Sequence, residues 1–496
     1  MKILSAEQIR KADQFTISNE PISSLDLMER AAESLMSFLL DFFPNDTGFL
    51  IFSGMGNNGG DGLALARLLH ESGNKVNLVL VKHSDSYSKD AQANLDRLPD
   101  GISVSEIHSK SDFKEWSKHQ VWVDALLGSG LTRPLEGFLA ELIEFMNDSE
   151  AYKVAVDIPT GLFADDNRSN DINLSLKADL TLSFQFPKRS FLIPSSAQRV
   201  GDFRILDIGL MQEFYEKLDT DTFLTHSIIK SIERLRNLHS HKGNFGHAFV
   251  LAGFPGMVGA GILSAKAALR VGVGKLTLMA KPETLPIFQT AIPEAMVDTH
   301  WVKGLTEIQK LADHADAFGA GPGLGTGDDA KLALKNLIQL ASVPMVLDAD
   351  ALNLLAENKT WLHYLPADSV LTPHWGEFKR LIGDFDTYEQ AYDEMRVFAR
   401  KYQVNLLVKG PNSCITSVNG KQYFNSSGNP ALASPGSGDV LTGMILGFMA
   451  QGYSGLDATC LGAYIHGWVA DDLVENGQWP ASVLAGDLIE ALKNWT

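Results

Sequence analysis

A short segment near the C-terminus, Pro435–Asp439, carries the residues with the clearest chemical potential. Glycines and a serine at the start of a helix leave backbone N–H groups free to hold an anion. The aspartate that follows them can act as a base toward a hydroxyl group. If this helix start needed only an N-cap, a single one of these residues would be enough. The segment therefore favours phosphoryl transfer to a hydroxyl group.

A second glycine-rich segment, Ser53–Gly62, lies between an expected strand and an expected helix. Backbone amides in such a turn can approach a ligand closely, and Asn57, Asn58 and Asp61 add oxygen ligands. The segment is neither a dinucleotide fingerprint nor a Walker loop, because no Gly-Lys-Ser/Thr follows. The alternative is a plain turn with Asp61 as the helix N-cap. The number of glycines favours a binding site.

Two more aspartates stand at expected strand ends. Asp124 leads into the loop 128–134, and Asp157 opens a turn that contains Thr160. Ligands of open parallel sheets bind beyond the carboxyl ends of the strands, so these loops are expected to converge with Ser53–Gly62. Lys188 is a weaker candidate, because a lone lysine after a proline usually lies at the solvated surface.

The second half of the chain repeats this pattern of glycine-rich loops and polar strand ends. The segments are Gly253–Gly261, Gly319–Gly325, Asp348–Asn353 and Thr372–His374. The segment Gly319–Gly325 is typical of a loop that approaches a ligand closely. His374 by itself fits a structural role as well as a ligand contact.

The elements that must position these residues follow from the apolar pattern. Alternation of short apolar runs with helix-like stretches predicts βαβ units and a parallel sheet. The expected strands of the first half are 49–52, 76–81, 121–125, 154–158 and 203–208. The expected helices are 61–72, 135–146 and two within 5–36.

A second run of strands begins after residue 220. The expected strands are 247–252, 275–279, 343–348, 369–372 and 405–409, with a helix near 260–271. The segment 211–236 is charged and lacks a buried-strand pattern, so the domain boundary is placed there. We expect two α/β domains, 1–220 and 221–496.

Composition restricts the partners. The 496 residues include 42 Lys and Arg against 60 Asp and Glu, a net charge of −18, which disfavours nucleic acid and anionic membrane surfaces. Two cysteines are too few for a disulfide framework or a Cys-rich zinc site. The longest apolar stretch, 440–450, is shorter than the ~20 residues of a membrane span. We expect a soluble cytoplasmic enzyme.

As a set, these motifs resemble the bifunctional NAD(P)H-hydrate repair enzymes, in which an NAD(P)HX epimerase domain is fused to an ADP-dependent NAD(P)HX dehydratase domain. The segments similar to the epimerase are 57–62, 124–134 and 156–161. Those similar to the dehydratase are 241–246, 348–353, 372–374, 409–410 and 436–439. The resemblance implies an N-terminal Rossmann-like three-layer αβα domain and a C-terminal ribokinase-like α/β domain.

For the first domain, the resemblance implies a site for the hydrated nicotinamide nucleotide. Its substrate-binding residues would be Asn57, Asn58, Gly59, Gly60, Asp61, Gly128, Ser129, Gly130, Leu131, Thr132, Arg133, Pro134 and Asp157. Asn58, Asp124 and Thr160 would hold K⁺. Asp157 would be the acid/base of epimerisation, assisted by Lys188.

For the second domain, it implies a site for the hydrate and for ADP as co-substrate, with Mg²⁺. The hydrate would contact Ala260, Gly323, His374 and Asp439, and Asp439 would be the catalytic base. The nucleotide would be held by Lys409, Gly410, Pro411, Asn412, Ser413 and Gly438. The products would be NAD(P)H, AMP and phosphate. A homo-oligomer is also expected.

The chain departs from the family pattern at four positions. Trp375 stands where a second proline is usual, Pro411 replaces an alanine, Ser413 a threonine and Asn244 an aspartate. None of these removes a hydroxyl or a charge with a chemical role, so the departures concern the detail of the nucleotide site.

Two alternatives remain at this stage. One is a ribokinase-like vitamin or sugar kinase with an N-terminal ligand-binding module. The other is a non-enzymatic N-terminal module that acts in protein interaction as a scaffold. Retention of Asp124, Asp157 and the two asparagines argues against the second.

Overall fold

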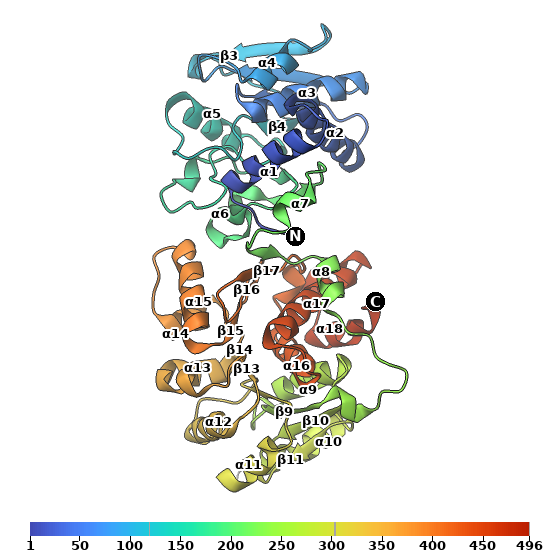
Figure 1. Ribbon diagram of the computed structural model, residues 1–496, viewed down its shortest axis with the longest axis vertical. Coiled ribbons are helices and arrows are strands. Elements are labelled where there is room, and N and C mark those ends of the chain that lie inside the picture. The colour runs from blue at the N-terminus through green and yellow to red at the C-terminus, as the bar shows by residue number, and fades with distance from the viewer. Residues whose placement is uncertain (119, 302–303, 496) are drawn as a thin grey trace. The chain divides into compact units, whose positions relative to one another are not determined.

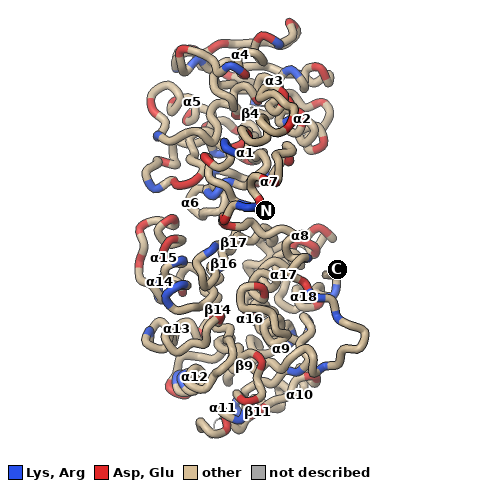
Figure 2. Tube along the Cα trace, viewed as in Figure 1, with Lys and Arg blue, Asp and Glu red and all other residues tan. Residues whose placement is uncertain are grey.

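The computed structural model describes residues 1–118, 120–301 and 304–495 (Figure 1). The chain divides into two compact units, Lys2–Thr220 and Asp221–Thr496, the latter together with Met1. In both units, acidic and basic residues are interspersed along the trace (Figure 2). In the part of the chain that is described, no helix combines the length and the apolar character needed to cross a membrane.

The first unit is built on a seven-stranded sheet with the order β3-β2-β1-β4-β5-β6-β7, in which every neighbouring pair is parallel. The strands are β1 (Phe49–Ser53), β2 (Val76–Val81), β3 (Ser103–Ile107), β4 (Val121–Ala125), β5 (Lys153–Val156), β6 (Leu180–Phe184) and β7 (Asp202–Leu206). The helices are α1 (Ala6–Asn19), α2 (Ser24–Phe42), α3 (Asn57–Glu71), α4 (Lys89–Leu95), α5 (Gly137–Asp148), α6 (Pro194–Val200) and α7 (Gln212–Tyr215).

Alternation along β1 builds the two cores of this unit. Phe49 and Ile51 pack in a cluster with α2 and α3, whereas Leu50 and Phe52 pack in a cluster with α5. Successive side chains of a strand point to opposite faces, so helices cover both faces of the sheet. The expected three-layer αβα fold is confirmed.

Several details differ from the sequence expectations, among them β6, a buried strand that was not expected. The strand expected over 154–158 ends at Val156, because Asp157 leaves the extended conformation with φ 65°. The helix expected from residue 61 begins at Asn57, which makes Asp61 an interior residue and not the N-cap. Strand β3 was missed because its residues are mostly exposed, so it lacks an apolar run.

The second unit contains a ten-stranded sheet with the order β11-β10-β9-β12-β13-β14-β15-β16-β17-β8. The strands are β8 (Thr222–Phe223), β9 (His247–Leu251), β10 (Lys275–Met279), β11 (Met296–Asp298), β12 (Ala317–Ala320), β13 (Met345–Leu347), β14 (Val370–Leu371), β15 (Asn405–Val408), β16 (Cys414–Thr416) and β17 (Gln422–Phe424). Strands from β11 through β15 are parallel, and β16 and β17 form antiparallel pairs.

The helices of this unit are α8 (His226–Ile232), α9 (Val258–Arg270), α10 (Leu285–Ala291), α11 (Leu305–Ala312), α12 (Asp328–Leu340), α13 (Ala349–Glu357), α14 (Trp375–Ile382), α15 (Tyr388–Tyr402), α16 (Ser437–Ala450), α17 (Gly455–Glu475) and α18 (Ala485–Ala491). Helix α16 is buried along nearly its whole length and packs closely on α9, where a Cβ at Gly443 would lie 2.0 Å from the Ser264 carbonyl oxygen. Strand β8 falls in the segment that was expected to hold no strand, because a two-residue strand leaves no periodic pattern.

Candidate active sites

The turn between β1 and α3 is shaped by close backbone packing. A Cβ at Gly54 would lie 2.1 Å from the Leu126 carbonyl oxygen, and one at Gly59 would lie 2.0 Å from that of Gly54. These glycines are therefore required by the fold itself. Gly56, the N-cap of α3, has open space beside it and no side-chain cap, so the first N–H groups of α3 can face a ligand.

Asp124 joins the loops that follow β4 and β5. Its carboxylate accepts hydrogen bonds from the Thr160 N–H at 2.8 Å and hydroxyl at 2.7 Å, and from the Leu126 N–H at 3.2 Å. Asp124 is fully buried, and burial raises its pKa to about 6. The structure therefore brings Asp124 and Thr160 into direct contact.

The third expected cation ligand, Asn58, comes from the β1–α3 turn and lies against the loop after β4. Its Oδ1 is 3.4 Å from the position a Cβ would take at Gly128. Its Nδ2 is buried and has no hydrogen-bond partner among the described residues. This N–H donor could serve an acceptor atom of a bound molecule, whereas a cation would be bound by the Asn58 Oδ1.

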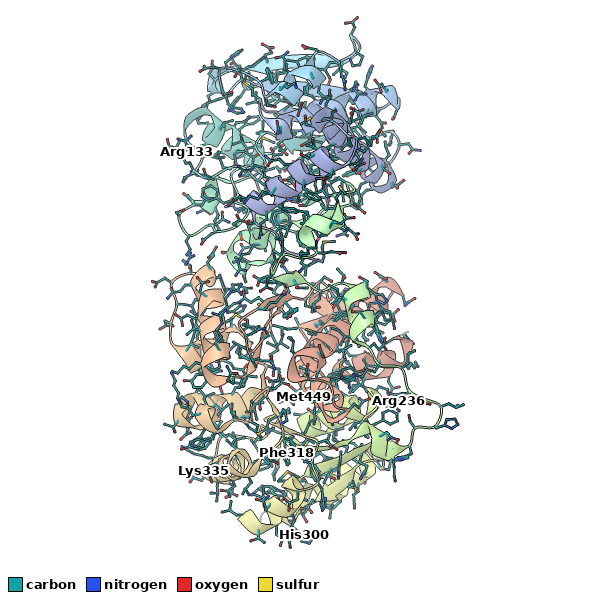
Figure 3. The ribbon with its side chains drawn as sticks, in the orientation of Figure 1. Arg133, Arg236, His300, Phe318, Lys335 and Met449 are labelled. Atoms are coloured by element: carbon teal, nitrogen blue, oxygen red, sulfur yellow. The ribbon has the colours of Figure 1, made fainter. Side chains whose placement is uncertain are left out.

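The other residues of the loop 128–134 lie at the same edge of the sheet. Ser129 and Leu131 are half-buried, and Gly130, Thr132, Arg133 and Pro134 are exposed. Arg133 extends outward from the unit (Figure 3). The loop thus presents an accessible, mixed surface beside the buried Asp124.

Lys188 is buried and forms an ion pair with Asp157. Only 1% of Lys188 is exposed, which contradicts the expectation of a solvated surface residue. Its Nζ also donates to the Ser183 hydroxyl at 2.7 Å, while the Asp157 carboxylate accepts the Phe184 N–H at 3.2 Å. A buried lysine held by one carboxylate can move a proton to or from a bound group.

The backbone at Asp157 is strained. Its φ of 65° lies in the left-handed region, and the Ile158 N–H donates across it to the Val156 carbonyl at 2.8 Å. A tight turn of this kind is rare in proteins and concentrates at functional sites. It directs the carboxyl of Asp157 toward Lys188.

The sequence analysis did not predict that two further carboxyl groups lie near this ion pair. Asp13 on α1 has its pKa raised to about 7 by burial and by the charge of Asp157, against the opposing effect of Lys188. Asp61, half-buried on α3, has its pKa raised by burial and by Asp157 and Asp13. No sequence pattern identifies Asp13 as a site residue, because a charged residue of a helix usually faces solvent.

The site of the second unit is centred on the first turn of α16. Gly436 is the N-cap with φ 86°, and no side chain caps the helix. Asp439 is the third helical residue and makes no capping hydrogen bond, so it does not cap this helix. Burial and the charges of Asp348 and Asp350 raise the pKa of Asp439 to about 6, against the effect of Lys409.

Lys409 follows β15 and lies beside this turn. Its Nζ contacts the Asp348 carboxylate at 2.8 Å and is 3.6 Å from where a Cβ would be at Gly438. Ser413 closes the loop after β15, with its hydroxyl donating to the Gly410 carbonyl at 2.9 Å. Pro411 and Asn412 form the accessible tip of the loop. The structure thus brings Lys409 and Gly438 together.

His374 serves as the N-cap of α14. Its Nδ1 accepts the N–H groups of Gly376 at 3.0 Å and Glu377 at 3.3 Å, so the ring proton of the neutral form lies on Nε2. The structural role considered for His374 is therefore present. The Nε2 lies 3.6 Å from the Glu377 Oε1, and because the His374 side chain is 55% exposed, a ligand can also reach it.

Gly323 and Ala260 lie close together. Gly323 has φ 58°, and a Cβ there would lie 2.5 Å from the Met257 carbonyl and 3.1 Å from the Ala260 Cβ. Glycine is required at this position, since both the backbone conformation and the space exclude a side chain. The interior of this unit is apolar, as at Phe318 (Figure 3).

Two different families match the two halves of the chain. A family described as YjeF-related protein N-terminus matches residues 24–190, and a family described as NAD(P)H-hydrate dehydratase matches residues 248–494. The bifunctional NAD(P)H-hydrate repair enzyme Nnr of Coxiella burnetii is 34% identical, covering 98% of this chain and 97% of its own.

Solved structures resemble the second unit. A hypothetical protein from Streptococcus mutans is 27% identical with a TM-score of 0.50, over 55% of this chain and 98% of its own. A ribokinase-like superfamily protein from Enterococcus faecalis is 26% identical with a TM-score of 0.48, over 55% of this chain and 94% of its own.

The whole-chain similarity matters because it spans both units. A lone kinase with an unrelated N-terminal module would match over one half only, whereas the Coxiella burnetii protein aligns over 489 residues. The resemblance suggested by the motifs is confirmed. This chain belongs to the family of bifunctional NAD(P)H-hydrate repair enzymes.

Proposed function

We propose that residues 1–220 interconvert the R and S forms of NAD(P)HX, and that residues 221–496 dehydrate the S form at the expense of ADP. The observation that carries this proposal is the arrangement of two separate groups of candidate residues in one chain of this family. One holds the Asp157–Lys188 pair, and the other holds Asp439 beside Lys409 at a free helix N-terminus.

Epimerisation requires a proton shuttle. The substrate carries a hydroxyl group on the carbon beside the ring nitrogen, so this carbon loses its configuration through a ring-opened or iminium form. Asp157 exchanges the proton with the substrate, and the buried Lys188 holds the Asp157 carboxylate in place. The N–H groups at the start of α3 and the loop 128–134 bind the remainder of the nucleotide.

A potassium ion fits the residues beside this site. Asp124 is fully buried, yet among the residues described no basic side chain pairs with it, and its partners Thr160 and Leu126 are uncharged. A buried carboxylate is normally paired with a cation or bound to a metal. Asp124, Thr160 and Asn58 would hold K⁺, which when bound supplies positive charge toward the nucleotide.

Dehydration requires a better leaving group than hydroxide. Asp439 removes the proton of the substrate hydroxyl, whose oxygen attacks the β-phosphorus of ADP and releases AMP. The N–H groups of the first turn of α16 and the Lys409 ammonium hold the phosphoryl group. The phosphate ester then eliminates phosphate, with loss of a ring proton, and leaves NAD(P)H.

The substrates are therefore NAD(P)HX and ADP, and Mg²⁺ bound with ADP would supply positive charge toward its phosphates. Among the described residues no cluster of three His, Cys, Asp or Glu is placed to hold a metal. Magnesium in such sites is held mainly by phosphate oxygens and water, which fits an ion that arrives with the nucleotide.

We also propose a cytoplasmic homo-oligomer. Two cysteines among 496 residues are too few for a disulfide framework, which supports a reducing compartment. Sedimentation of the purified protein measures the oligomeric state directly.

Incubation with the separated R and S hydrates tests the function. With ADP, both hydrates should regenerate NADH absorbance, and the R form should need the epimerase. With a vitamin alcohol and ATP, no phosphorylated product should form. Turnover of the alcohol without recovery of NADH would reverse the assignment in favour of a vitamin kinase.

Replacing Asp124 with alanine should slow epimerisation by roughly 10–100-fold, the range found when groups around a metal are lost. Stimulation of the wild-type rate by KCl should disappear, while dehydration of the S hydrate should persist. Thr160→Ser, which keeps the hydroxyl, is the matched control and should retain the KCl response. A KCl response in Asp124→Ala equal to wild type would show that the ion is held elsewhere.

A further inference from the structure

The carboxylate of Asp348 joins three elements at the dehydratase site. Asp348 follows β13 and is 2% exposed. Its Oδ1 contacts the Lys409 ammonium at 2.8 Å and accepts the Ala349 N–H at 2.8 Å, and its Oδ2 accepts the Thr442 hydroxyl at 2.6 Å. Both oxygens are thus fully engaged with α13, with the end of β15 and with α16.

The backbone around Asp348 is built to hold this side chain. Ala349 has φ 47°, a left-handed conformation that is rare for a residue other than glycine. On the other side, a Cβ at Gly321 would lie only 1.8 Å from the Asp348 carbonyl oxygen. Strain of this kind persists where the surrounding structure fixes it, and it concentrates at functional sites.

Lys409 needs a counter-charge to stay beside the first turn of α16. A Cβ at Gly438 would lie 3.6 Å from the Lys409 Nζ and 3.8 Å from the Asp348 Oδ2. The N-terminus of a helix carries partial positive charge and repels a cation. The Lys409 side chain is 23% exposed, so an unpaired ammonium would be free to turn toward solvent.

We propose that Asp348 is a positioning residue of the dehydratase. It holds the Lys409 ammonium at the first turn of α16 and anchors that turn through Thr442, so that the phosphoryl group of ADP meets a cation and N–H groups that are already in place. This inference rests on the proposed function of the second unit. Asp348 itself does not need to touch the substrate.

The charge of Asp348 also acts on the base. The groups that face Asp439 are Asp348 and Asp350, which raise its pKa together with burial, and Lys409, which lowers it. His466 contacts Ser437 at 3.2 Å and has its pKa lowered by burial, so it is neutral near pH 7. Loss of the Asp348 charge should therefore lower the pKa of Asp439.

Asp348→Asn tests the proposal, because asparagine keeps the shape and removes the charge. We expect kcat/KM for ADP to fall by about 10²-fold, as for a misplaced binding group, while the KM for the hydrate stays unchanged. The acid limb of the pH–rate profile, which is expected near pH 6 in the wild type, should move to lower pH. If Asp348 had only a structural role, the substitution would change neither the position of the acid limb nor the ratio of the KM for ADP to the KM for the hydrate.

A double-mutant cycle with Lys409→Met shows whether Asp348 acts through Lys409. ADP binding, measured by calorimetry without turnover, should weaken in each single variant, and Asp348→Asn should add little in the Lys409→Met background. Thr442→Val retains both charges, so it should weaken ADP binding without moving the acid limb. This variant tests the anchor even where Asp348→Asn folds poorly.

Asp368→Asn is the matched control. Asp368 precedes β14, at the opposite end of the same sheet, and accepts hydrogen bonds from Asn405 Nδ2 at 2.7 Å and the Gly455 N–H at 2.7 Å. The Asp368→Asn variant should have a lower Tm, and its ADP binding and pH profile should be unchanged. Wild-type ADP affinity and pH profile in Asp348→Asn would overturn the proposal. Absence of dehydration in the wild type would instead overturn the proposed function.

Discussion

Asp439→Asn should reduce dehydration of S-NAD(P)HX by about 10²–10⁴-fold, the usual effect of removing a general base. Asparagine has nearly the same shape and cannot accept the hydroxyl proton. ADP should still bind, because the N–H groups of the first turn of α16 and Lys409 remain. Epimerisation should be unchanged, because it takes place in the other unit.

The pH dependence follows from the same group. Asp439 must be ionised to act as a base, and burial with nearby negative charge raises its pKa to about 6. Dehydration by the wild type should therefore fall as the pH drops below about 6. NADH absorbance recovered at each pH measures this limb.

Stability should change in the opposite sense to activity. A carboxyl whose pKa is raised in the folded state takes up protons on folding, so its ionisation destabilises the protein as the pH rises from about 4 to above 6. Asp439→Asn should melt at or above the wild-type temperature at pH 7.5, and this advantage should vanish near pH 4. Near-normal dehydration in this variant would mean that another group is the base.

Asp157→Asn should abolish epimerisation to a similar extent, about 10²–10⁴-fold, and leave dehydration of the S hydrate intact. Asparagine tolerates the left-handed backbone at this position. The variant leaves the Lys188 ammonium buried without its partner, which typically destabilises a protein by about 3–5 kcal/mol. A lower Tm is therefore expected together with the loss of activity.

The double variant Asp157→Asn/Lys188→Met separates catalysis from folding. Replacing both partners removes the unpaired charge, so the Tm should recover toward the wild-type value. Epimerisation should remain absent, as measured by the exchange of R and S peaks on a chromatogram in the absence of ADP. Wild-type exchange in the double variant would show that the pair serves stability only.

Local sequence patterns predict much of the architecture. Short apolar runs separated by glycine and proline are sufficient to predict the central strands β1, β2, β4, β9 and β10, because buried parallel strands are apolar on both faces. Exposed or very short strands such as β3 and β8 carry no such pattern and were missed. The strand-end rule also places Asp124 and Asp157 at one edge of the first sheet.

What the sequence by itself determines, then, is the set of motifs and the order of the elements, since both depend on spacing along the chain. Tertiary structure decides which side chains meet and how deeply they are buried. Thr160 lies 36 residues from Asp124, and Thr442 lies 94 residues from Asp348, yet each pair is hydrogen-bonded. The burial of Lys188 and the raised pKa values of Asp13 and Asp439 arise from such distant contacts, because solvent exclusion and charge proximity are properties of the packed chain.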